Sequence, residues 1–299
     1  MISDENREKN ADRRNCPIGV FDSGIGGMTV LKEIWKVLPN ESTIYFGDSG
    51  RSPYGTKSHD TIVQFSLQNM RFLLSQDVKL IVIACNTASA QAYDAVRTEA
   101  DVPVVEVITP GAGQAVEATK NGRIGIIATR STVSSGVYRR AVQNAADDLR
   151  SKSGNTQALD DLYIEEVACP LFVSLAEEGW WDSPATRMIA EEYLAGLKER
   201  GVDLLILGCT HYPLLRKVIG DVMGPSTILV DAGTSVANRI AAVLTEAQLD
   251  RTESAAPTHR FYTSDNPGMF EELAATFLGG GRPSGTEYVV TESFGGAEK

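Results

Sequence analysis

The chain has 299 residues, of which 42% are hydrophobic and 22% are charged, as in a folded globular protein with room for two domains. Lys and Arg number 28 against 39 Asp and Glu, which gives a formal net charge of −11. This acidity, without a basic patch, argues against a nucleic-acid partner. No segment approaches the roughly 18 consecutive apolar residues of a membrane helix, so no membrane association is expected.

The N-terminal stretch 1–15 is charged throughout and contains no apolar core of the kind that a signal peptide requires. We therefore expect a cytoplasmic protein. Cysteines in a reducing compartment are rarely paired, and a chain of this length has enough core without disulfides. All four are therefore predicted to be free thiols: Cys16, Cys85, Cys169 and Cys209.

Short apolar runs rich in β-branched residues alternate with helical patterns along the chain. This alternation predicts parallel sheets covered by helices. The apolar side chains between Val30 and Leu38 fall on one helical face, and Pro39 ends that helix. Polar residues 145–162 predict a helix end followed by a surface loop. The predicted strands are 18–21, 43–46, 80–84, 104–107, 123–128, 163–167, 204–207, 227–230 and 288–290.

Two segments repeat one design, in which a buried apolar run stops at a cysteine followed by hydrogen-bonding residues. They are Leu80-Ile-Val-Ile-Ala-Cys-Asn-Thr87 and Leu204-Leu-Ile-Leu-Gly-Cys-Thr-His211. Ile18-Gly-Val-Phe21 and Ile124-Gly-Ile-Ile127 form a second similar pair. The repeats predict an α/β fold of two pseudo-symmetric three-layer domains, with mainly parallel sheets and a cleft between them.

Each predicted domain supplies one thiol at a strand end, where ligands of parallel α/β sheets bind. An interior cysteine is often only a small hydrophobic side chain. Here, however, Cys85 precedes a predicted helix at 88–96, and Pro213 marks a helix after Cys209. A helix N-terminus lowers the pKa of a thiol. Two opposed thiols suit chemistry that removes a proton from one face of a carbon and returns it to the other.

Two titratable residues accompany these thiols in the sequence. His211 stands two positions after Cys209, where it can exchange a proton or tune the thiol, or else serve as a packing histidine. Asp22 ends the first predicted strand, where it acts as an acid or orienting group, or else caps a helix. Cys209 and His211 also suggest zinc, but a structural site needs four ligands and no second cluster occurs. No metal is therefore expected.

Hydroxyl and backbone groups at the predicted strand ends have the chemistry of an anion site. Neither a phosphate-binding loop nor a dinucleotide-binding glycine pattern is present, which argues against a nucleotide. An acidic substrate is expected instead. The residues that would hold it are Ser23, Tyr54, Gly55, Asn86, Thr87 and Thr210.

Four segments together resemble the glutamate racemases, which are cofactor-independent enzymes of the aspartate/glutamate racemase superfamily. They are Gly19-Val-Phe-Asp-Ser-Gly-Ile-Gly-Gly27, Gly47-Asp-Ser-Gly-Arg-Ser-Pro-Tyr-Gly55, Ala84-Cys-Asn-Thr-Ala88 and Leu207-Gly-Cys-Thr-His-Tyr-Pro213. The resemblance runs from about residue 17 to near the C-terminus. The Pro53-Tyr54-Gly55 segment favours glutamate racemases over aspartate and hydantoin racemases.

The resemblance implies that L- and D-glutamate are interconverted by two thiols, which supplies D-glutamate for peptidoglycan. Cys85 would take the α-proton from D-glutamate and Cys209 from L-glutamate, assisted by Asp22 and His211 respectively. Glu177 would be a further supporting acid. The chain departs from the family pattern at two positions: Ser174 stands where proline is usual, and Gly50 where alanine is usual. The implied substrate contacts are Asp22, Ser23, Pro53, Tyr54, Gly55, Asn86, Thr87 and Thr210, with Thr129 and Thr132 nearby.

The resemblance also implies how the chain divides. An extension at 1–16 would precede a first domain of 17–108 plus 224–299, and a second domain would span 109–223. Glutamate is the expected small-molecule partner, no cofactor is expected, and a homodimer is compatible with the resemblance.

Three other functions remain open from the residues. One is a racemase for aspartate or another acidic amino acid. Another is a pyridoxal-phosphate enzyme, although no lysine occupies a predicted strand end. The last is a thiol redox or ligand-binding protein, which the absence of a Cys-x-x-Cys motif disfavours.

Overall fold

The computed structural model describes residues 13–152 and 159–295. Part of the expected 1–16 extension and the middle of the 145–162 segment lie outside these ranges. The chain forms two compact units, one made of Met1–Glu106 with Gly233–Lys299 and the other of Val107–Ala232. Within the described ranges, no helix combines the length and the apolar character needed to cross a bilayer.

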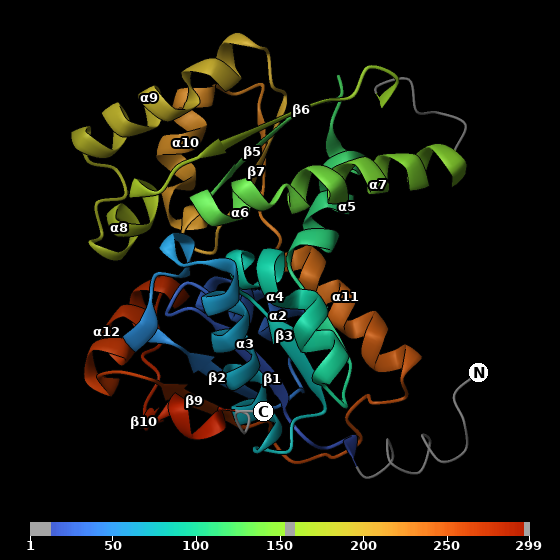
Figure 1. Ribbon diagram of the computed structural model, residues 1–299, viewed down its shortest axis with the longest axis vertical. Coiled ribbons are helices and arrows are strands. Elements are labelled where there is room, and N and C mark those ends of the chain that lie inside the picture. The colour runs from blue at the N-terminus through green and yellow to red at the C-terminus, as the bar shows by residue number, and fades with distance from the viewer. Residues whose placement is uncertain (1–12, 153–158, 296–299) are drawn as a thin grey trace. The chain divides into compact units, whose positions relative to one another are not determined.

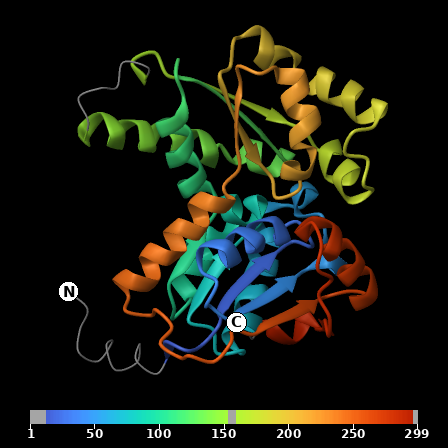
Figure 2. The same ribbon diagram turned by 180° about the vertical axis from the view of Figure 1, so that it is seen from behind.

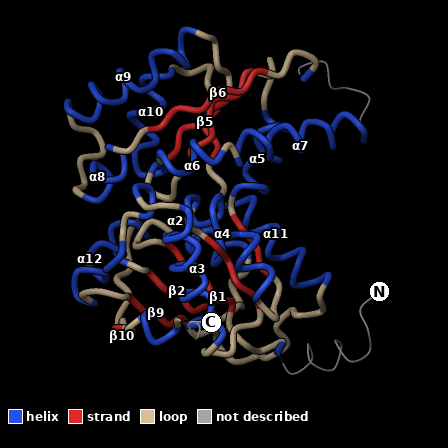
Figure 3. The backbone as a smooth tube through the Cα atoms, in the orientation of Figure 1, coloured by secondary structure: helices blue, strands red, loops and turns tan. Residues whose placement is uncertain are grey.

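The first unit contains a six-stranded parallel sheet in the order β10-β9-β2-β1-β3-β4. Its central strands are completely buried, as expected for a sheet covered on both faces. Figure 3 shows these strands in red within the helical layers. The bounds are β1 Ile18–Asp22, β2 Thr43–Gly47, β3 Leu80–Ile83, β4 Val104–Glu106, β9 His259–Thr263 and β10 Glu287–Tyr288.

Helices cover both faces of this first sheet. α3 (His59–Leu74) and α4 (Asn86–Glu99) pack together on one face (Figure 1). On the opposite face, seen in Figure 2, α2 (Met28–Val37) packs against α11 (Gly233–Glu246) and α12 (Pro267–Leu278). The described part of this unit also contains shorter 3₁₀ helices at Ser49–Arg51, Tyr54–Thr56 and Thr291–Phe294.

The second unit contains a four-stranded parallel sheet in the order β6-β5-β7-β8. Its strands are β5 Arg123–Ala128, β6 Tyr163–Ala168, β7 Leu204–Gly208 and β8 Ile228–Val230. The helices are α5 Ile108–Ala118, α6 Arg130–Ser135, α7 Val137–Lys152, α8 Leu171–Glu177, α9 Pro184–Glu199 and α10 Arg216–Met223, with a 3₁₀ helix at Tyr212–Leu215. α8, α9 and α10 share one hydrophobic core with β7, while α5 packs against α7.

Four strands of the first sheet and the four strands of the second sheet are arranged in the same order. The first sheet contains β2-β1-β3-β4 and the second is β6-β5-β7-β8, so β1 corresponds to β5, β2 to β6, β3 to β7 and β4 to β8. Cys85 follows β3 and Cys209 follows β7, which are counterparts in this scheme. The prediction of two related parallel α/β halves is therefore confirmed by the strand order.

Several boundaries differ from those expected. Strand β8 pairs with β7, so the second unit continues to Ala232 rather than ending at 223. Strand β9, at His259–Thr263, was not predicted, because its first residues are polar and exposed. The last strand is Glu287–Tyr288 rather than 288–290. Helix α7 extends to Lys152, so residues 145–152 of the 145–162 segment are helical and not part of a loop.

Candidate functional site

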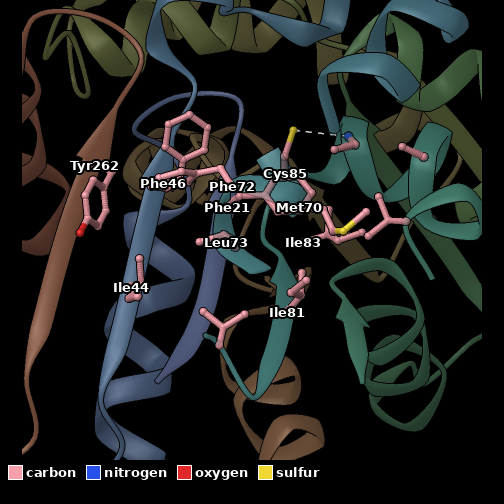
Figure 4. Close-up of a cluster of buried hydrophobic side chains, with 14 of the residues drawn as sticks. Phe21, Ile44, Phe46, Met70, Phe72, Leu73, Ile81, Ile83, Cys85 and Tyr262 are labelled. Carbon is pink, nitrogen blue, oxygen red and sulfur yellow. Dashed lines mark hydrogen bonds between the residues drawn. The ribbon is translucent and has the colours of Figure 1, made fainter. Parts of the chain in front are cut away.

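The first group of candidate residues lies at the carboxyl ends of β1, β2 and β3. Cys85 caps α4, and its Sγ accepts a hydrogen bond from the backbone N–H of Ala88 at 3.4 Å. The sulfur also lies 3.5 Å from the Ser23 hydroxyl. Figure 4 shows Cys85 at the margin of a hydrophobic cluster, with its sulfur directed away from Ile81 and Ile83. The thiol thus lies at the edge of the cluster and is still buried.

Asp22, the last residue of β1, is completely buried and acts on this thiol by its charge. Its Oδ1 accepts a hydrogen bond from the backbone N–H of Gly24 at 3.1 Å. Burial, and then the charge of Asp22, raise the pKa of Cys85 to about 12, against smaller opposite effects of the bonds from Ser23 and Ala88. The expected lowering by the helix N-terminus is therefore outweighed, and Cys85 is protonated at neutral pH.

The other candidates of this unit surround the same sheet edge. Asn86 and Thr87 are the first residues of α4 and, like Ser23, are buried. The Pro53–Gly55 segment follows β2 and enters a 3₁₀ helix at Tyr54. Tyr54 is buried with its hydroxyl turned inward onto Asp48, so this turn presents backbone groups rather than the tyrosine hydroxyl.

The second group lies at the carboxyl end of the second sheet and contains a chain of three side chains. Cys209 follows β7, and its Sγ lies 3.8 Å from Nδ1 of His211. The other ring nitrogen, Nε2, lies 2.8 Å from Oε1 of Glu177, which ends α8. The neighbouring Glu178 is exposed. Of the two adjacent acids, Glu177 is the one placed on the histidine.

The two partners of His211 decide its charge. Burial by itself would lower the pKa of this imidazole, but the hydrogen bonds to Cys209 and Glu177, together with their charges, raise it to about 10. His211 is therefore an imidazolium at neutral pH. Its N–H and positive charge beside the Cys209 sulfur are an arrangement that suits a thiolate.

The surroundings of Cys209 differ from those expected. Pro213 is the second residue of a 3₁₀ helix, Tyr212–Leu215, and the α-helix α10 starts only at Arg216. Cys209 therefore does not cap an α-helix as Cys85 does. Its electrostatic support comes from a side chain, His211, instead of a helix N-terminus.

Two further groups stand at the same sheet edges. Thr129 caps α6 and its hydroxyl lies 3.0 Å from that of Thr132, at the end of β5. Cys169 is buried after β6, and its backbone carbonyl accepts a hydrogen bond from the Tyr212 hydroxyl at 2.9 Å. Among the residues with described placement, no group of three or more His, Cys, Asp or Glu side chains could hold a metal ion.

Sequence reasoning named no role for the polar side chains beneath the Pro53–Gly55 turn. Asp48 is fully buried there and binds Arg51, which also reaches Asn69 at 3.0 Å. The opposite charges of Asp48 and Arg51, three residues apart, could have predicted this ion pair from the sequence. Asn69 lies on α3, and nothing in its local sequence marked it.

Comparisons with known proteins identify the family of this chain. Residues 19–240 match the Asp/Glu/hydantoin racemase family. A glutamate racemase of Geobacter metallireducens is 46% identical over 263 residues, covering 88% of this chain and 93% of the relative. The crystal structure of glutamate racemase from Francisella tularensis in complex with D-glutamate superposes with a TM-score of 0.83 at 37% identity, covering 94% of this chain and 99% of that one.

A Picrophilus torridus aspartate racemase is more distant, with a TM-score of 0.52 and 18% identity over 78% of this chain and 94% of that one. This last likeness concerns the fold alone. The match to the family over most of the chain, and the identity to the Geobacter relative, settle the assignment. The chain belongs to the Asp/Glu/hydantoin racemase family.

Proposed function

We propose that this protein is a glutamate racemase that interconverts L- and D-glutamate with two cysteine thiols and no cofactor, and that its product D-glutamate serves peptidoglycan synthesis. One observation carries the proposal: equivalent strands of two sheets with the same strand order are each followed by a buried cysteine next to an ionisable partner. Family membership and the resemblance to glutamate racemases support it.

The reaction requires one thiolate and one thiol in each direction. Cys209, as thiolate, takes the α-proton from L-glutamate, and Cys85, as thiol, donates its proton to the opposite face of the resulting carbanion. The product is D-glutamate, and the reverse direction exchanges the two roles. Both sulfurs must reach the same carbon for this to occur.

The two surroundings suit different starting charges. Burial and Asp22 keep Cys85 protonated, whereas Cys209 faces an imidazolium held by Glu177. The free protein is thus prepared to deprotonate L-glutamate at Cys209 and to protonate the carbanion from Cys85. After one turnover from L-glutamate, Cys209 holds the proton and Cys85 does not, which is the state that the reverse direction requires.

An α-proton is far less acidic than a thiol, so the carbanion needs donors around the substrate carboxylate. Groups at the strand ends provide hydroxyls, an amide and backbone N–H groups without a lysine cluster. We assign substrate binding to Asp22, Ser23, Pro53, Tyr54, Gly55, Asn86, Thr87 and Thr210. Tyr54 and Gly55 would contribute through their backbone.

Glutamate is proposed over aspartate because the relatives at 40–46% identity are named glutamate racemases. The Francisella relative is a complex with D-glutamate. The likeness to an aspartate racemase, at 18% identity, supports only the common fold.

Circular dichroism of purified protein with each enantiomer of glutamate tests this proposal. Both solutions should converge to zero ellipticity without added cofactor, while L-aspartate should keep its signal. Cys85→Ser and Cys209→Ser should each nearly abolish the change, because each direction uses both sulfurs, while the control Cys16→Ser should retain it. A protein that leaves glutamate unchanged, or prefers aspartate, would overturn the assignment.

A further inference from the structure

A buried polar cluster supports the Pro53–Gly55 turn from below. Its centre is Asp48, which follows β2 and has no solvent-exposed surface. Nε of Arg51 donates to both carboxylate oxygens, at 2.9 and 2.8 Å, and the guanidinium also stacks on Phe65 at 4.0 Å. Further bonds from Arg51 reach Gln68 and Asn69 of α3. A buried carboxylate is stable only with such a set of donors.

Tyr54 connects this cluster to the turn. Its side chain is only 1% exposed, and its hydroxyl donates to Asp48 and accepts a hydrogen bond from Asn69 Nδ2 at 3.0 Å. Burial, and then the charge of Asp48, raise the pKa of this hydroxyl well above its usual value, so it keeps its proton. The single proton of Tyr54 is thereby committed to Asp48, and the residue anchors the turn.

Ser264 completes the cluster from the C-terminal part of the chain. Its hydroxyl donates to Oδ1 of Asp48 at 2.7 Å and accepts from the backbone N–H of Gly50 at 3.1 Å. A Cβ added at Gly50 would lie 2.6 Å from the backbone oxygen of Ser264, which is closer than real contacts allow. The missing Cβ of Gly50 is therefore what permits this close approach.

We propose that Ser264 and Arg51 are positioning residues which, acting through Asp48 and Tyr54, hold the Pro53–Gly55 turn in the form that binds the substrate. This inference rests on the proposed function, because it takes that turn as part of the substrate site. The hydroxyl of Ser264 fixes Oδ1 of Asp48, which leaves Oδ2 oriented for Tyr54. The two ends of the anchor come from segments more than 200 residues apart in sequence.

Two variants with intact packing test the inference, Ser264→Ala and Tyr54→Phe. The first readout needs no activity: hydrogen exchange of the Lys57 amide, which donates to the Tyr54 carbonyl at 3.0 Å and so reports on the turn. Loss of one bond to a buried carboxylate should accelerate this exchange about tenfold in the ligand-free protein. Ser151→Ala, at an exposed serine whose hydroxyl donates to the Asp148 carbonyl, is the control and should leave the rate unchanged.

The second readout is steady-state racemisation of L-glutamate. KM should rise about three- to tenfold in both variants while kcat stays within about twofold, because the turn binds substrate and does not carry protons. Gly50→Ala, which displaces Ser264, should behave as Ser264→Ala does.

Unchanged Lys57 exchange, or faster exchange with an unchanged KM, would overturn the inference. Inactive wild-type protein would instead refute the proposed function, while the exchange would still test the anchor.

Discussion

His211 bridges Glu177 and Cys209 in the second unit: its Nε2 lies 2.8 Å from Oε1 of Glu177 and its Nδ1 lies 3.8 Å from Sγ of Cys209. Both ring nitrogens therefore have an acceptor, which is the arrangement that an imidazolium requires. In the first unit, Cys85 instead lies beside Asp22, Ser23 and the α4 N-terminus. The two thiols thus occupy equivalent positions in the fold with different electrostatics.

Glu177→Gln should lower the pKa of His211, because it removes the negative charge that favours the imidazolium and leaves a neutral amide oxygen as a weaker acceptor. The alkaline limb of kcat/KM for L-glutamate should move to lower pH, and kcat/KM should fall about tenfold. Glu178→Gln, at the exposed adjacent acid, is the matched control and should leave the profile in place. Equal profiles for the two variants would remove Glu177 from the account.

The two cysteines should differ in their reaction with iodoacetamide at pH 7. They are almost equally buried, at 5% exposed for Cys85 and 6% for Cys209, so access does not separate them. Thiolates react and thiols do not, and only Cys209 has an imidazolium partner. Peptide mass spectrometry should therefore find Cys209 alkylated first. Earlier labelling of Cys85 would contradict the assigned charges.

Stability should fall as the pH becomes alkaline. The pKa of His211 in the folded protein, about 10, lies above its ordinary value, so its stabilising contribution is complete below about pH 6.5 and is lost as the pH rises towards 10. Cys85 acts in the same direction because its pKa is also raised. Thermal unfolding at pH 6, 8 and 10 should show a decreasing Tm, and the decrease should be smaller in His211→Asn. An identical decrease in this variant would show that His211 is not the group that titrates.

Gly27 allows Asp22 to pack beneath the start of α2. A Cβ at this position would lie 2.7 Å from Cβ of Asp22 and 2.7 Å from the Tyr45 hydroxyl. Gly27→Ala should therefore reduce the free energy of unfolding by about 1–3 kcal/mol, measured by urea denaturation. Gly113→Ala in α5, where a Cβ meets nothing within 4 Å, is the control and should stabilise by up to about 1 kcal/mol. Similar effects at both positions would contradict the packing argument.

The sequence predicted the features that depend on buried apolar runs. Strands such as Leu80–Ile83 and Leu204–Gly208, and the position of a cysteine after each, follow directly from hydrophobic runs that stop abruptly. Strand His259–Thr263 could not be predicted, because its first two residues are polar and exposed and its pairing with β2 is set by tertiary contacts.

Electrostatics were the less predictable part of the site. The α4 N-terminus suggested a lowered pKa for Cys85, but the degree of burial and the closeness of Asp22 depend on the folded packing. Likewise, the distance between Glu177 and His211 is fixed by where α8 ends relative to β7, which no local pattern contains.

The most direct test of the two-thiol mechanism is racemisation of L-glutamate in D₂O, followed by mass spectrometry of the separated enantiomers at low conversion. One sulfur removes the proton from Cα of the substrate, while the other sulfur delivers a deuteron that it has taken up from D₂O. Early D-glutamate should therefore carry deuterium at Cα while the remaining L-glutamate stays protiated. Extensive early deuteration of the recovered L-glutamate would indicate a single exchanging base and would contradict the account.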